Sequence, residues 1–233
     1  MIQYKINWKQ LLIITLGGIF FFTFVVQINK EKETQSKELK ILFIGNSITK
    51  HPPKPSVGWL GNYGMAATGI NNDYVHKFMS YIRKDKKINS YMAINVSQWE
   101  RNFLYAKDNY LKAKNFEANL IIIRLGENID EKYAKNMNFK QNLLELINFF
   151  KSNNRAKVII TNTFWPREFL SNKIFELSEE KKYIFVDISD LWNDKSNAAF
   201  GQFGNIFVQR HPSNKGMDEI AKKIYQQYRE DIL

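Results

Sequence analysis

Residues 39–53 read LKILFIGNSITKHPP, an apolar run that stops abruptly at Gly45-Asn46-Ser47. A near-continuous run of Leu, Ile and Phe is typical of a strand whose two faces are both covered. A tight turn at the end of such a strand can hold one hydroxyl out into a cleft. We therefore predict a buried strand over 39–45, with Ser47 at its carboxyl end as a candidate functional residue.

The rest of the soluble region alternates between similar apolar runs and helical patterns. Helical spacing is clearest in 73–84, 139–150 and 217–228, where apolar residues recur every three or four positions. Strand–helix alternation repeated about five times indicates a parallel sheet with helices on both sides. The predicted fold class is α/β, a three-layer αβα sandwich with a central parallel sheet of about five strands. Further strands are expected at 91–96, 118–126, 156–163 and 182–188.

The N-terminal segment differs from the rest of the chain. An uninterrupted apolar stretch, 11–26, comes after Lys5 and Lys9 and before a charged run. This is the pattern of a signal sequence or a short membrane anchor. No small-x-small cleavage site follows, so we favour an uncleaved anchor with the main domain outside the cytoplasm; cleavage would give a secreted protein. We predict an anchor or signal segment with a charged tether over 1–37, and one α/β domain over 38–233.

The composition excludes several classes of function. Hydrophobic residues make up 44% of the 233 residues, which is enough for a core. The net charge of +11 is scattered along the chain, so we do not expect nucleic acid as a partner. The absence of cysteine excludes disulfides, thiolate zinc sites and a cysteine nucleophile. The three histidines are scattered along the chain, so we expect no metal site. The turn after the first predicted strand is not a glycine-rich phosphate loop, so we expect no cofactor.

Polar residues also follow other predicted strands. Asn128 comes just after the third strand, and His211 precedes the last helix. Sites in open α/β sheets form at the carboxyl ends of the strands, so these residues are expected to meet Ser47. A serine in this position, taken singly, is more often a helix cap than a nucleophile, and Asn128 alone could be an ordinary loop residue. Together they suit a serine nucleophile, a histidine base and an amide donor to an oxyanion.

At this point the chain resembles a known family, the GDSL-type or SGNH serine hydrolases, which have a flavodoxin-like fold. Residues 45–48 (GNSI) are similar to the first block of the family, 126–128 (GEN) to the third, and His211 to the histidine of the last. The resemblance covers 39 to about 230 and implies that Ser47 is the nucleophile and His211 the base. Asn128 and the backbone amide of Ser47 would then be the oxyanion donors. The stretch 58–76 looks like a carbohydrate-active branch of the family.

Two positions depart from the family pattern. The aspartate that the family usually carries three residues before the histidine is replaced by Val208. A main-chain carbonyl serves in some members, and Glu127 and Asp187 are the candidate orienting acids here. The second block has no glycine in INVSQWERN, so Ser97 or Gln98 is expected to offer its backbone amide instead.

Several residues near the strand ends are candidates for lining a substrate cleft. Trp59, Trp99 and Trp165 could stack on sugar rings, although aromatic residues at such positions are as often part of the core. His51 lies just past Ser47, whereas His76 is expected to be a structural residue within a helix. The cleft candidates are Asn46, His51, Trp59, Trp99 and Trp165.

These observations predict a membrane-tethered serine esterase. It would remove an acyl group, expected to be acetyl, from a carbohydrate or a cell-envelope glycan. The same residues could instead transfer the acyl group to a sugar hydroxyl, as a glycan O-acetyltransferase. Val208 and the missing glycine leave open a catalytically inactive glycan-binding domain. Hydrolysis of lipid esters would need a broad apolar groove, for which the sequence offers little sign.

Overall fold

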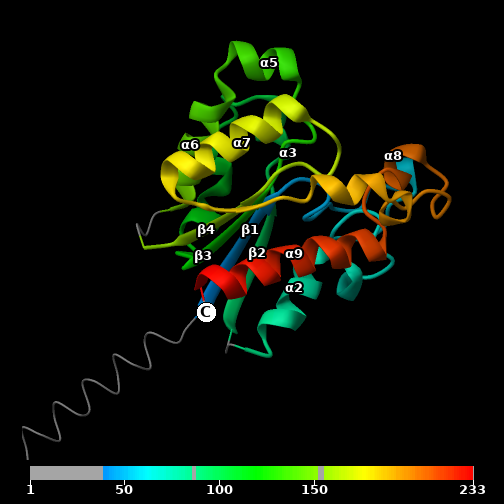
Figure 1. Cartoon of the computed structure of the whole chain (residues 1–233). Coiled ribbons are helices and arrows are strands. Elements are labelled where there is room, and N and C mark those ends of the chain that lie inside the picture. The colour runs from blue at the N-terminus through cyan, green and yellow to red at the C-terminus, as the bar shows by residue number, and fades with distance from the viewer. Residues whose placement is uncertain (1–38, 86–87, 152–154, 233) are drawn as a thin grey trace, which may run out of the picture. The chain divides into compact units, whose positions relative to one another are not determined.

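The computed structural model describes residues 39–85, 88–151 and 155–232. Its centre is a sheet of five parallel strands in the order β2-β1-β3-β4-β5. The predicted α/β class and all five strand positions are confirmed (Figure 1). The strands are β1 (Leu39–Gly45), β2 (Ile88–Asn95), β3 (Leu120–Arg124), β4 (Lys157–Thr161) and β5 (Ile184–Val186).

Helices cover both faces of the sheet and complete the predicted three layers. Helices α2 and α9 pack on one face, and α6 and α7 lie over the other together with α3, α4 and α5 (Figure 1). The helices are α2 (Tyr74–Ile82), α3 (Ser97–Arg101), α4 (Leu111–Lys114), α5 (Glu131–Asn136), α6 (Phe139–Phe150), α7 (Glu168–Lys181), α8 (Ile206–Gln209) and α9 (Asn214–Ile232). Short 3-10 turns are η1 (Pro55–Val57), η2 (Ile70–Asn72), η3 (Lys107–Tyr110), η4 (Ser189–Asn193) and η5 (Lys195–Asn197).

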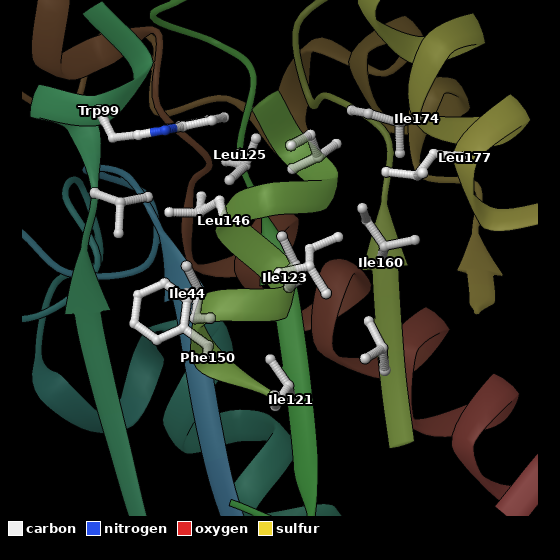
Figure 2. Close-up of a cluster of buried hydrophobic side chains, with 14 of the residues drawn as sticks. Ile44, Trp99, Ile121, Ile123, Leu125, Leu146, Phe150, Ile160, Ile174 and Leu177 are labelled. Carbon is white, nitrogen blue, oxygen red and sulfur yellow. The ribbon is translucent and has the colours of Figure 1, made fainter. Parts of the chain in front are cut away.

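Alternating side chains of the strands build two separate cores. Leu42 and Ile44 of β1 point toward α6 and α7, whereas Ile41 and Phe43 point toward α2 and α9. Figure 2 shows the first core, in which Ile44 and Ile123 lie beside Leu146 and Phe150 of α6. Because both faces of β1 are covered from residue 41 onward, residues 41–44 are all apolar, as the sequence indicated.

The predicted membrane anchor, 11–26, lies outside the described residues, so both the anchor and the boundary at 37/38 remain predictions. In the part of the chain that the structure describes, no helix combines the length and the apolar character that a membrane span requires.

The end of β1 has no room for a side chain at position 45. A Cβ added to Gly45 would lie 2.0 Å from Thr49 Oγ1 and 2.4 Å from the Arg124 carbonyl oxygen of β3. Thr49 cannot easily yield, because it is buried and its hydroxyl bonds to that of Tyr74 at 2.8 Å. The glycine therefore lets the turn carrying Ser47 pack tightly against the neighbouring strand.

We expect Gly45→Ala to lower the free energy of unfolding by about 1–3 kcal/mol, because the new methyl group must displace Thr49 or the strand. Chemical denaturation of the purified protein measures the change. Gly204→Ala is the matched control, since a Cβ at Gly204 would meet nothing within 4 Å. Equal stability of the two variants would contradict the steric account.

Candidate active site

Ser47 and His211 meet at the carboxyl edge of the sheet. Ser47 follows β1 in a turn closed by bonds from the Thr49 and Lys50 amides to the Asn46 carbonyl. Its Oγ lies 2.8 Å from Nε2 of His211, which stands between α8 and α9. This distance lets the imidazole accept the hydroxyl proton, as activation of a serine nucleophile requires.

A backbone carbonyl orients the imidazole. Nδ1 of His211 lies 2.8 Å from the carbonyl oxygen of Phe207 in α8. A carbonyl can only accept, so Nδ1 carries the proton and the lone pair of Nε2 faces Ser47. Val208 packs its side chain into an apolar cluster with Trp59, Met65, Ala66 and Ala199. The position of the usual acid is thus used for packing, and main-chain geometry supplies the orienting acceptor.

The two candidate orienting acids have other partners. Glu127 accepts bonds from Arg124 at 2.6 and 3.0 Å and from the Phe164 amide at 2.9 Å. Asp187 accepts from Asn162 at 2.6 Å and from the amide and hydroxyl of Ser189. The structure gives neither carboxylate a bond to His211, because the Phe207 carbonyl already occupies Nδ1.

A buried polar network, formed by Asn46, Glu100, Arg124 and Glu127, lies beneath the dyad. Asn46 Nδ2 donates to Glu127 at 2.6 Å and to Glu100 at 3.0 Å, and its Oδ1 accepts from Arg124 at 2.6 Å. Burial opposes the charge on Glu127, but the Arg124 guanidinium and the bonds that Glu127 accepts hold its pKa below the ordinary value. Burial, followed by the charge of Glu127, raises the pKa of Glu100. The network joins the end of β1 to the end of β3.

Glu100 also positions Asn128. Its carboxylate accepts a bond from Asn128 Nδ2 at 2.6 Å and another from the Gly126 amide at 2.6 Å. An amide nitrogen carries two hydrogens, so Asn128 keeps a second N–H for another acceptor. Asn128 lines the same cavity as Ser47. The arrangement therefore holds Asn128 in the wall of the cavity that Ser47 also lines.

The second block supplies no clear amide donor. Ser97 opens α3 and lines the cavity, but its amide donates to Asn95 Oδ1 at 2.8 Å. Gln98 is not among the lining residues. The predicted use of one of these amides thus remains a prediction.

The cavity at the dyad measures about 330 Å³. His51 and Trp165 line it, as predicted for cleft residues. Its lining residues are Ser47, His51, Lys54, Val57, Met65, Ser97, Arg101, Asn128, Trp165, Phe207, Val208, Arg210 and His211.

Three predicted cleft residues lie elsewhere, and each is a correction. Asn46 is fully buried because its amide is held by the polar network. Trp99 belongs to the core that contains Leu146 and Phe150 of α6 (Figure 2). Its ring centre lies 4.9 Å from that of Phe103. Trp59 is buried beside Tyr63 and donates its indole N–H to the His51 carbonyl. Both indoles are therefore packing residues.

Trp165 forms the wall next to the imidazole. Its indole Nε1 donates to the Arg210 carbonyl at 2.8 Å, and its ring meets that of His211 edge to face at 5.6 Å. These contacts help to exclude water from one side of the histidine. Burial lowers the pKa of His211 to about 4, although the bond to the Phe207 carbonyl opposes this shift. The imidazole is consequently neutral at physiological pH, as a base must be.

We expect the His211 imidazole to titrate near pH 4, well below its ordinary pKa of 6.5. Because the unfolded chain would then bind the proton more tightly, this group lowers the free energy of unfolding progressively as the pH falls from about 6.5 toward 4. An NMR titration of histidine ring carbons measures the pKa, and His211→Gln identifies the resonance. A midpoint near 6.5 would show that the ring is solvated.

Sequence reasoning missed three contributors to the site. Arg124 stood inside an apolar strand, and a buried cation is a signal that a carboxylate must lie nearby. Glu100 gave no such signal, because its partners come from distant segments. The role of Phe207 depends on its main-chain carbonyl, which every residue possesses.

Comparison with known proteins adds evidence on the fold. No protein-family model matches the chain, and no curated protein matches its sequence. Among solved structures, it is similar to a two-domain esterase active on acetylated mannans, with a TM-score of 0.55, 15% identity and 88% of this chain covered. The chain spans 52% of that esterase.

Two other solved structures match over nearly their whole length. An acetyl xylan esterase has a TM-score of 0.50 and 15% identity over 81% of this chain and 98% of its own. A protein from Bacteroides ovatus described as a GDSL-like lipase has a TM-score of 0.53 and 14% identity over 82% and 99%. The chain thus has the fold of the GDSL/SGNH esterases and lipases, which confirms the fold expected from its sequence blocks.

Proposed function

We propose that this protein is a serine esterase that removes acyl groups, acetyl in the first place, from a carbohydrate. The observation that carries the proposal is the assembled dyad: Ser47 Oγ lies 2.8 Å from His211 Nε2, and the Phe207 carbonyl holds the other ring nitrogen in the required tautomer. An inactive binding domain has no need of this geometry. The structure therefore favours catalysis over a purely binding role.

The reaction would run in two halves. Ser47 Oγ attacks the ester carbonyl carbon while its proton passes to His211 Nε2, and the carbonyl electron pair moves onto the oxygen. Asn128 Nδ2 and the Ser47 amide donate to this oxyanion. As the carbonyl re-forms, the ester C–O bond breaks and the imidazolium gives its proton to the departing sugar oxygen, leaving acyl-Ser47 and a free sugar hydroxyl. His211 then takes a proton from a water molecule that attacks the acyl carbon, and returns it to Ser47 Oγ as the acid leaves.

The size and lining of the cavity support a short acyl group on a sugar. A volume of about 330 Å³ suits an acetyl group and part of one sugar ring. Phe207 and Trp165 present aromatic surface to it, and charged side chains also line it. The solved structures of similar fold include esterases of acetylated mannan and acetyl xylan, which supports carbohydrate as the substrate class.

On sequence grounds alone, we further propose that residues 1–37 tether the enzyme to a membrane with the catalytic domain outside. Such an enzyme would act on glycans at the cell envelope. Transfer of the acyl group to another sugar would use the same dyad, so the acceptor alone separates hydrolase from transferase.

Replacing Ser47 by Ala should reduce hydrolysis of p-nitrophenyl acetate by roughly a thousandfold or more, because the nucleophile is lost. The parent, but not the variant, should also react with a fluorophosphonate probe. Release of nitrophenol measures the rate, and circular dichroism checks that the variant is folded. A folded parent that neither hydrolyses the ester nor reacts with the probe would refute the esterase proposal.

Glu100 should act through Asn128. We expect Asn128→Ala to lower kcat by about 10²–10³-fold, and Glu100→Gln by about tenfold or more, because each weakens the oxyanion donor. If Glu100 only positions Asn128, the double variant should be little worse than Asn128→Ala alone. Steady-state kinetics with p-nitrophenyl acetate gives all four values. Multiplicative losses in the double variant would mean that Glu100 acts independently.

A further inference from the structure

Three cationic side chains border the cavity that contains the dyad. Lys54 precedes η1, Arg101 ends α3, and Arg210 immediately precedes His211. They reach the cavity from segments far apart in the chain, and all three residues are exposed. No aspartate or glutamate lies among the described residues that line this cavity. Its polar rim therefore carries charge of one sign.

No carboxylate in the described part of the chain pairs with these three cations. Within the described ranges, Lys54, Arg101 and Arg210 form no ion pair, whereas Lys140, Lys215 and Lys222 each pair with a carboxylate. The Arg101 guanidinium donates only to oxygens of neutral groups, the Ser97 carbonyl at 3.0 Å and the Asn128 side chain at 3.5 Å. Arg210 lies over the Trp165 ring at 5.5 Å. The arginines are held in place while their charge stays available.

The carboxylates nearest to the dyad do not cancel this charge in the cavity. Glu100 and Glu127 are buried beneath it, where Arg124 and several N–H donors satisfy them. His51, which lines the cavity, responds to the cations: burial lowers its pKa, and Lys54 and Arg101 lower it further although the bond to the Pro52 carbonyl opposes them. A concave site lined by one sign of charge attracts ligands of the other sign.

We propose that the substrate is an anionic carbohydrate, in which a carboxylate or phosphate lies close to the acyl ester. This inference rests on the proposed esterase function and names its substrate class. Arginine is suited to either group, because its planar guanidinium can donate two parallel hydrogen bonds to carboxylate or phosphate oxygens. Lys54 adds a third positive charge at the border of the cavity. The contacts are to a part of the sugar that does not react, so they act mainly on KM.

The first experiment compares acetate release from three acetylated polymers of equal ester content: polygalacturonate, a phosphorylated mannan and neutral xylan. We expect kcat/KM to be about tenfold or more higher on at least one anionic polymer than on xylan. Raising NaCl from about 50 to about 500 mM should shrink that difference, because salt screens exposed charges. The preferred anionic polymer identifies the carboxylate or the phosphate. Equal or better hydrolysis of xylan overturns the inference.

The second experiment removes the charges. In Lys54→Gln/Arg210→Gln, the ratio of kcat/KM on the anionic polymer to that on xylan should fall about tenfold, mostly through KM. Lys140→Gln/Lys222→Gln is the matched control, because it removes two positive charges from residues that do not line the cavity. It should keep the ratio of the parent. An equal loss of selectivity in both variants would assign the effect to net charge and contradict the proposal.

A binding measurement distinguishes failure of the substrate inference from failure of the esterase proposal. Calorimetry with Ser47→Ala should show tighter binding of galacturonate or mannose-phosphate oligosaccharides than of xylo-oligosaccharides. Ser47-dependent hydrolysis without any preference for anions would overturn the substrate class and keep the esterase. Selective binding of an anionic oligosaccharide, with no hydrolysis of any ester by the parent, would overturn the esterase and keep the anionic site.

Discussion

The burial of Arg124 at the end of the central strand β3 constrains the whole carboxyl edge of the sheet. A guanidinium without access to water must be paired and hydrogen-bonded, and Glu127 supplies the pair at 2.6 Å. Glu127 can do so only if the chain turns directly after β3, and that turn places Asn128 beside the serine. Asn46 then links the pair to the turn that carries Ser47. One electrostatic requirement thus constrains the positions of Ser47 and Asn128 together.

The histidine is held in a different way. It comes from a loop near the other end of the chain, and its orientation depends on the single turn α8, which presents the Phe207 carbonyl to Nδ1. A carbonyl fixes the tautomer as well as a carboxylate does, but it carries no full charge to stabilise an imidazolium. The low pKa of His211 agrees with this difference, because burial outweighs both the bond to the neutral Phe207 carbonyl and the smaller effect of the Glu127 charge. The site has orientation without the usual acid.

The charges around the dyad form two layers of opposite accessibility. The inner layer of Glu100, Arg124 and Glu127 is buried and internally paired, so it acts on structure. The outer layer of Lys54, Arg101 and Arg210 is exposed and unpaired with carboxylates in the described part of the chain, so it can act on a ligand. Part of the net positive charge of the chain is therefore concentrated at the cavity.

The sequence by itself determined the fold, because apolar runs such as 41–44 and 120–123, repeated in alternation with helical patterns, indicate strands covered by helices on both faces. It also indicated that Ser47, Asn128 and His211 would share one edge, since parallel strands end on the same side. Only the tertiary structure decided the rest. Trp165 faces the cavity and Trp99 does not, and this depends on the direction of each side chain. Segments that follow a strand have no sequence periodicity from which that direction could be predicted. The Phe207 carbonyl that orients His211 is a main-chain group, which every residue possesses, so no residue type signals it. Glu100 and Asn128 lie far apart in the sequence, so only the packed structure shows that they are bonded.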